Sequence, residues 1–179
     1  MKWFLRGIFL VIFLFVVTCI AGFFLPAIQT HERSAQINAY AEDVFAHLND
    51  LHSYHEWSPL QPALKGANVI YDGPDMGVGQ SMVWKDGSGE HSFGAQEILQ
   101  SSDLEFVQLS QNLAGRELTA THAILTQGSG EGVIVLTKTE TALGGFPYLS
   151  RVRAKLKSGN ANQELDAALS RLKALSETR

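Results

Sequence analysis

His122 is the residue of this chain whose surroundings best suit chemistry. It alternates with Leu118, Ala120 and Ile124, so in an extended strand its imidazole shares their apolar face. An imidazole on such a face can bind the polar end of a ligand or exchange a proton near neutral pH. It can equally be a neutral core histidine that is hydrogen-bonded to a neighbouring strand or a tyrosine. Both interpretations remain open from the residues alone.

A second group of titratable side chains lies earlier in the chain and comprises His47, His52, His55 and Glu56. His52 and His55 are three residues apart, a spacing that two zinc ligands can use. Their neighbours are solvent-type residues, and no third ligand follows at a motif spacing. We therefore interpret these histidines as surface residues and predict no metal site.

Other catalytic motifs are missing from the sequence. Gly73-Pro74 and Gly77-Val78-Gly79 have no helix start and no Lys-Ser/Thr behind them, so they predict a turn between strands and not a phosphate-binding loop. No Ser-His-Asp order, carboxylate pair or dinucleotide fingerprint occurs. The single cysteine, Cys19, lies in an apolar run, which excludes an internal disulfide. We predict no cofactor, and His122 stays the one weak catalytic candidate.

The elements that would position these residues begin with a run of about 19 apolar residues over positions 7–25, long enough to cross a bilayer. Lys2 and Arg6 precede it, which favours a cytoplasmic N-terminus. We therefore predict that residues 1–30 form a single-pass anchor in the cytoplasmic (inner) membrane and that residues 31–179 form a domain on its periplasmic, extracytoplasmic side. A cleaved signal peptide is the main alternative. A lipoprotein with its lipid attached at Cys19 is a weaker one, because Thr18 does not suit a lipid-attachment box.

Composition narrows the functions open to the domain. The whole chain has 14 basic and 18 acidic residues, and two of the cations, Lys2 and Arg6, belong to the anchor, so the domain is more acidic than the whole chain. This argues against a nucleic-acid partner, which would require a basic face. One basic stretch stands out, with Arg151, Arg153, Lys155 and Lys157 within seven residues. It could contact anionic lipid headgroups or form the solvated side of a helix.

The pattern of the domain predicts an α+β fold. Residues 32–38 alternate like a strand, and residues 42–51 and 53–59 read as two short helices. Six strands divided by turn residues follow, over positions 69–72, 80–85, 90–99, 104–111, 117–126 and 132–141. Connections this short favour an antiparallel meander. Apolar residues at helical spacing return over positions 149–156 and, after Gly159-Asn160, over 165–175 as a terminal helix that would cover the sheet.

Several of these residues together resemble one family. The match runs from Arg33-Ser34 through Trp57-Ser58-Pro59 and the segment 71–84, where Tyr71-Asp72-Gly73-Pro74 precedes Gly77-Val78-Gly79 and Trp84. It continues through the Gly-rich turn before Val133 to the closing "L..LK...E" pattern at Leu169, Leu172, Lys173 and Glu177. In this order and spacing the chain resembles the START-like (SRPBCC, polyketide cyclase/dehydrase and lipid-transport) superfamily over about residues 31–178, and in particular membrane-anchored bacterial members.

The resemblance implies a helix-grip fold, in which a curved antiparallel sheet wraps around a long C-terminal helix and leaves a cavity. The side chains expected to line it are Trp57, Met82, Trp84, Val107, Leu109, His122 and Ile124. The resemblance then implies a membrane-tethered domain that binds an apolar or lipid-like small molecule. A cyclase-, dehydratase- or hydrolase-like enzyme that uses His122 as acid or base is one alternative. An envelope scaffold without a ligand is another.

Overall fold

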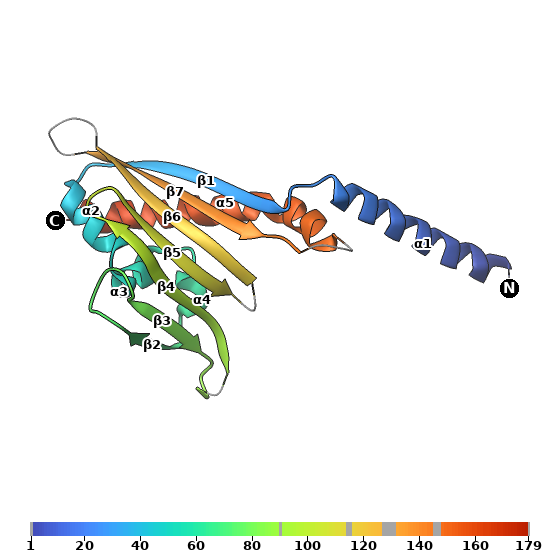
Figure 1. The fold of residues 1–179 in the computed structure, drawn as a ribbon, viewed down its shortest axis with the longest axis horizontal. Helices are drawn as coiled ribbons and strands as arrows, with labels where there is room; N and C mark the ends of the chain where they lie inside the picture. The colour runs from blue at the N-terminus through green and yellow to red at the C-terminus, as the bar shows by residue number, and fades with distance from the viewer. Residues whose placement is uncertain (1, 90, 114–115, 127–131, 145–147, 179) are drawn as a thin grey trace. The chain divides into compact units, whose positions relative to one another are not determined.

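A computed structural model describes residues 1–179 except 1, 90, 114–115, 127–131, 145–147 and 179 (Figure 1). The chain forms two compact units. The first comprises residues 1–29 and 142–159, and the second comprises residues 30–141 and 160–179. The turns expected at Ala114-Gly115 and Gly128-Ser129-Gly130 fall outside the described residues.

The first unit contains the apolar helix α1 (Lys2–Phe23) and the first turns of helix α5 (Leu149–Ser176). In α1 the segment Trp3–Phe23 has a mean hydropathy of 2.6 and none of it is buried, so its length and composition suffice to cross a membrane. The end of α1 meets the start of α5 at Tyr148. The Phe23 and Tyr148 rings lie edge to face at 5.9 Å, and Arg151 Nη1 donates to the Leu25 carbonyl at 3.2 Å.

The second unit is built on one seven-stranded sheet with the order β1-β7-β6-β5-β4-β3-β2. The strands are β1 (Ile28–Ile37), β2 (Asn68–Asp72), β3 (Ser81–Lys85), β4 (Ser92–Ser102), β5 (Phe106–Leu113), β6 (Arg116–Thr126) and β7 (Val133–Ala142). Strands β2 to β7 pair antiparallel in sequence order, as the short connections predict. The sheet breaks register at two places in β4, next to Ser92 and at Ile98–Gln100.

Side chains alternate across this sheet except at the register breaks of β4, and one face is buried. On β6 the buried positions are Ala120, His122 and Ile124, whereas Leu125 on the other face is exposed. The buried face packs against three short helices, α2 (Ala41–Leu48), α3 (Leu51–Trp57) and α4 (Gln61–Leu64), and against the last turns of α5. Leu169 and Leu172 of α5 belong to the same apolar core as the inner residues of the strands. This is the α+β arrangement of a sheet covered by a C-terminal helix that the sequence predicts.

The C-terminal helix differs from the expectation in one respect. The pattern predicts two helical stretches separated at Gly159-Asn160, but α5 is continuous from Leu149 to Ser176. A single glycine inside a helix costs only about 1 kcal/mol relative to alanine, which long flanking helical segments offset. Two smaller differences occur: β1 begins at Ile28 and not at residue 32, and the short helix α4 was not expected.

Trp84 is buried on the inner face because its cross-strand partner is a glycine. Trp84 pairs with Gly94 of β4, and a Cβ added at Gly94 would collide with the indole ring. The indole ring also contacts Phe93 edge to face, with a centroid separation of 6.4 Å. The absence of a side chain at position 94 therefore lets the largest side chain of β3 lie against the sheet.

This contact yields a first prediction. Gly94→Ala should lower the free energy of unfolding by about 1–3 kcal/mol, because overpacking displaces a rigid buried ring. Urea unfolding of the full chain in detergent, followed by circular dichroism, measures the change. Gly87→Ala is the matched control, because a Cβ at Gly87 meets no atom within 4 Å. Equal midpoints for the two variants would contradict the packing argument.

Candidate functional site

Five buried polar side chains gather on the inner face of the sheet and on α3. We call them the interior polar cluster; they are Tyr54, Gln96, Gln111, His122 and Thr137. The sheet register explains their grouping. Gln96 of β4 pairs with Gln111 of β5, and His122 of β6 pairs with Thr137 of β7. Tyr54 reaches them from α3, which packs over this face. Polar groups so deep in a core require hydrogen-bond partners.

The Tyr54 hydroxyl is held by one of the two glutamines. Gln111 Nε2 donates to the Tyr54 oxygen at 2.8 Å. Burial raises the pKa of Tyr54, and the neighbouring amides of Gln111 and Gln96 oppose that shift only in part. Gln96 thus lies close enough to favour the phenolate, but neither its Nε2 nor its Oε1 has the distance and angles of a hydrogen bond. Gln96 therefore brings a donor and an acceptor into the core without a partner for either.

His122 is the second member with an unused polar atom. Its Nδ1 lies 3.0 Å from Thr137 Oγ1, while its Nε2 is buried and has no hydrogen-bond partner. The Trp57 and Tyr54 rings approach the imidazole at 5.3 and 5.7 Å between centroids. Burial lowers the pKa of His122 to about 3, so the imidazole is neutral at physiological pH. A neutral imidazole can direct Nε2 at a ligand as either donor or acceptor, depending on its tautomer.

All seven side chains expected to line a cavity are buried within the same core. They are Trp57, Met82, Trp84, Val107, Leu109, His122 and Ile124, each at most 6% exposed. The register places Val107 opposite His122 and Met82 opposite Gln96. Trp57 joins them from the end of α3, and Trp84 lies further along β3. The structure thus brings the predicted residues to one face, while the cavity itself stays a prediction.

Sequence reasoning missed Tyr54, Gln96 and Gln111. The sequence did contain a signal for the two glutamines. In the two-residue period of a strand, Gln96 falls on the same buried face as Ile98, and Gln111 falls on the same buried face as Val107 and Leu109. A polar residue on the buried face of a strand indicates a functional or hydrogen-bonded position. Tyr54 carried no comparable signal, because a tyrosine on a short helix packs in a core as readily as it binds a ligand.

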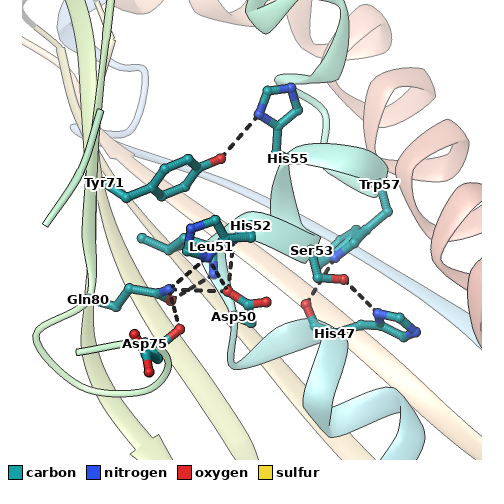
Figure 2. A network of polar contacts seen from close by, with 10 residues as sticks. All are labelled: His47, Asp50, Leu51, His52, Ser53, His55, Trp57, Tyr71, Asp75 and Gln80. Atoms are coloured by element: carbon teal, nitrogen blue, oxygen red, sulfur yellow. Dashed lines mark hydrogen bonds and ion pairs between the residues drawn. The ribbon is translucent and has the colours of Figure 1, made fainter. Parts of the chain in front are cut away.

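A second polar network lies nearer the surface, where α3 begins (Figure 2). We call it the Asp50 network. Asp50 accepts from the His52 backbone N–H and from His52 Nδ1, each at 2.9 Å. Burial raises the pKa of Asp50, but the hydrogen bonds from His52 and Gln80 outweigh it, so its pKa lies below the usual value. A side-chain acceptor before the first turn is the usual N-cap of a helix.

Gln80 connects this cap to the sheet. Its Nε2 donates to Asp50 Oδ1 at 3.1 Å and to the Asp75 carbonyl at 2.7 Å. Its Oε1 accepts from the Leu51 N–H at 2.8 Å. One buried amide, directly before β3, therefore joins the start of α3 to the turn that precedes β3 (Figure 2). Every polar atom of this side chain is used, so we interpret the Asp50 network as structural.

The remaining histidines of this region are engaged in the same way. The His52 ring stacks on Tyr71 at 3.9 Å, and His55 Nδ1 lies 3.4 Å from the Tyr71 hydroxyl. His47 Nδ1 lies 2.6 Å from Ser53 Oγ. Within the described part of the chain, no group of three or more His, Cys, Asp or Glu side chains could hold a metal ion.

Comparison with known proteins identifies the fold. No protein-family model matches the chain, and no curated protein sequence matches it. Solved structures do match. Truncated norcoclaurine synthase from Thalictrum flavum superposes with a TM-score of 0.58 and 16% identity, over 85% of this chain and 95% of that one. A protein from Chromobacterium violaceum gives 0.56 and 16%, over 84% and 98%. A protein from Nitrosospira multiformis gives 0.58 and 13%, over 84% and 97%.

These matches define a class of proteins in which an antiparallel sheet packs on a long C-terminal helix. The chain has the helix-grip fold of that class, the Bet v1-like or START-like (SRPBCC) fold, as its sequence motifs indicate. One of the matching structures is norcoclaurine synthase in complex with dopamine and hydroxybenzaldehyde, at 16% identity and a TM-score of 0.54. At this identity the likeness concerns the fold, and a shared fold does not carry an activity with it.

Proposed function

We propose that the protein is a membrane-tethered domain that binds an apolar or lipid-like small molecule whose polar end meets Gln96 and His122. The observation that carries the proposal is the presence of three buried polar atoms without partners, Gln96 Nε2, Gln96 Oε1 and His122 Nε2. Each such atom costs about 1–3 kcal/mol when it stays unpaired. A ligand that supplies a donor and an acceptor would recover this free energy.

The surroundings of these atoms support an apolar body for the ligand. Val107 and Leu109 of β5 and Ile98 of β4 flank the polar cluster, and each is fully buried. Binding sites for small molecules are commonly apolar with a few polar groups that fix orientation. Met82, directly opposite Gln96, is a flexible side chain that can repack around a guest. Proteins with this fold typically bind hydrophobic ligands.

The enzyme alternative has less support. A general base works best when its pKa lies near the operating pH, whereas burial lowers the pKa of His122 to about 3. As a neutral hydrogen-bonding group, His122 suits recognition better than proton transfer. The scaffold alternative requires an interior that holds no ligand, so it is an outcome of the experiment below.

We further propose that α1 is retained as the anchor. Residues that follow the end of α1 at Phe23 take part in the folded first unit. Leu25 O accepts from Arg151, and the Ala27 carbonyl accepts from the Leu143 N–H at 2.7 Å. Cleavage near residues 26–30 would remove these contacts. Lys2 and Arg6 favour a cytoplasmic N-terminus, which places the domain on the extracytoplasmic side, close to the bilayer where apolar ligands partition.

The test starts from the full chain purified in detergent and transferred to nanodiscs. Native mass spectrometry should find a small molecule bound to the protein. As defined probes, 2-naphthol and naphthalene differ only in a hydroxyl, and titration should show tighter binding of 2-naphthol. Gln96→Leu should reduce that preference about 3- to 10-fold, the value of one hydrogen bond, without lowering stability.

Gln100→Leu is the control, because it makes the same change at an exposed position of the same strand. Protein that copurifies with no small molecule and binds neither probe would refute the binding function and would favour a role as an envelope scaffold. Equal loss of preference in both variants would refute the role of Gln96.

A further inference from the structure

The two units of the chain carry opposite charge. Six cations lie in the first unit (Lys2, Arg6, Arg151, Arg153, Lys155 and Lys157), and its sequence contains no aspartate or glutamate. The other eight cations and all 18 acidic residues lie in the second unit, whose net charge is therefore −10. The positive first unit attracts anionic partners, whereas the acidic second unit repels them. An anionic partner is therefore expected at the first unit alone.

Two cations of α5 share one face of the helix with exposed leucines. Leu149, Arg153, Leu156 and Lys157 follow one another at i, i+4, i+7 and i+8, which places them on the same side. Leu149 is 44% exposed and Leu156 is 82% exposed. Arg153 and Lys157 are exposed between and beside them. We call these four residues the basic face of α5; the exposed Lys155, six positions after Leu149, projects from another side of the helix. An apolar strip bordered by cations is typical of helices that lie in a membrane interface.

The basic face begins where the membrane-spanning helix ends. A Cβ at Gly22 would lie 2.7 Å from Tyr148 Cβ, so the end of α1 approaches the residue just before α5 closely. The Arg151 guanidinium lies 4.8 Å above the Tyr148 ring while it donates to the Leu25 carbonyl. Gln29 Nε2 donates to the Ala154 carbonyl at 3.0 Å. These contacts fix the first turns of α5 at the exit of α1, which for an anchored chain is the level of the lipid headgroups.

We infer that the basic face of α5 rests on anionic phospholipid headgroups of the bilayer that α1 crosses. The inference rests on the proposed retention of α1 as an anchor. Arg153 and Lys157 meet the phosphates, and Leu149 and Leu156 enter the interface beside them. Arg151 takes no part, because it holds the end of α1. Each cation near an anionic surface is worth about 5-fold in partitioning, so the two together are worth about 25-fold.

A spin label at position 156 tests this directly. Leu156→Cys, in a Cys19→Ser background, carries a nitroxide in full-length protein reconstituted into vesicles. In vesicles of phosphatidylcholine and phosphatidylglycerol (7:3), oxygen should relax the label more effectively than a water-soluble nickel complex. In pure phosphatidylcholine the order should reverse. The double variant Arg153→Ser, Lys157→Ser should keep the water-exposed signal in both.

The control variant Lys65→Ser, Lys85→Ser removes the same charge from the acidic unit and should behave like the parent. A label that stays in water in anionic vesicles, or equal loss in both double variants, would overturn the inference. A carbonate wash of every sample measures separately whether α1 anchors the protein in the vesicle membrane. Protein that resists the wash with a water-exposed label refutes the docking alone, while protein that washes off refutes the anchor.

Discussion

Between pH 7 and pH 4 the free energy of unfolding should fall by about 3 kcal/mol through His122 alone. The pKa of this imidazole is about 3 in the folded protein and about 6.5 in an unfolded chain. Between those values the unfolded state binds the proton and the folded state does not, so stability falls as the pH falls. The loss begins near pH 6.5 and increases until the folded state is itself protonated.

The measurement is a series of urea unfolding curves of the full chain in nonionic detergent between pH 7 and pH 4. Other groups also contribute to acid sensitivity, Asp50 among them, because its lowered pKa makes its stabilising contribution disappear at low pH. The informative quantity is therefore the difference from His122→Gln, whose amide cannot titrate and should flatten the profile. His91→Gln removes an exposed imidazole that pairs with Asp86 at the surface, so it should change the parent profile far less than His122→Gln does. Parallel profiles for the parent and His122→Gln would contradict the burial argument.

The neutral state of His122 also connects stability with the proposed function. A protonated imidazole would need a counter-charge, and the interior polar cluster supplies amides and hydroxyls but no carboxylate. The same surroundings that make the fold acid-sensitive keep Nε2 available as an uncharged hydrogen-bonding atom. Because the folded imidazole stays neutral down to about pH 3, a ligand that pairs with neutral Nε2 should bind the folded protein with the same affinity at pH 7 and at pH 5.

The sheet was the part of the structure that the sequence predicted best. Alternation along β6 places His122 on the buried face with Ala120 and Ile124, and short glycine-containing turns predict the antiparallel order. The continuity of α5 was not accessible in this way, because Gly159-Asn160 reads as a break. Local helix propensity is a weak guide there, since packing of Leu165 and Leu169 on the sheet stabilises the helix from a distance.

The site was harder to predict from the sequence than the fold, for a physical reason. Periodicity tells which face of a strand is buried but not which strands pair in which register. The contact of Gln96 with Gln111 depends on the β4–β5 register, which includes a shift between Ile98 and Gln100. Tyr54 completes the cluster from a helix that follows no strand period. Single-strand patterns therefore identified His122 alone, whereas the unpaired amide of Gln96 appears only when the strands are assembled.

Trp57 stands at the junction of three helices. Its Nε1 donates to the His47 carbonyl of α2 at 3.1 Å, and its ring meets Tyr54 edge to face at 4.8 Å. Its own carbonyl accepts from Arg171 Nε of α5 at 3.0 Å, and the Ser58 carbonyl accepts from Arg171 Nη2 at 2.7 Å. A guanidinium at the last carbonyls of a helix satisfies groups that have no partner within the helix. Trp57 thus joins α2, α3 and α5 to one another.

Trp57→Ala should lower the free energy of unfolding by about 3–5 kcal/mol, because it leaves a large cavity and removes the hydrogen bond to His47. That is a large share of the 5–15 kcal/mol that holds a typical domain. Trp57→Phe fills most of the space but has no N–H donor, so its free energy of unfolding should lie between that of the parent and that of Trp57→Ala. Urea unfolding followed by circular dichroism measures both, with Trp3→Ala as the control, since Trp3 lies on α1 and is 82% exposed. A loss below about 1 kcal/mol for Trp57→Ala would mean that the core closes around the missing ring, and that α2 and α5 hold α3 without it.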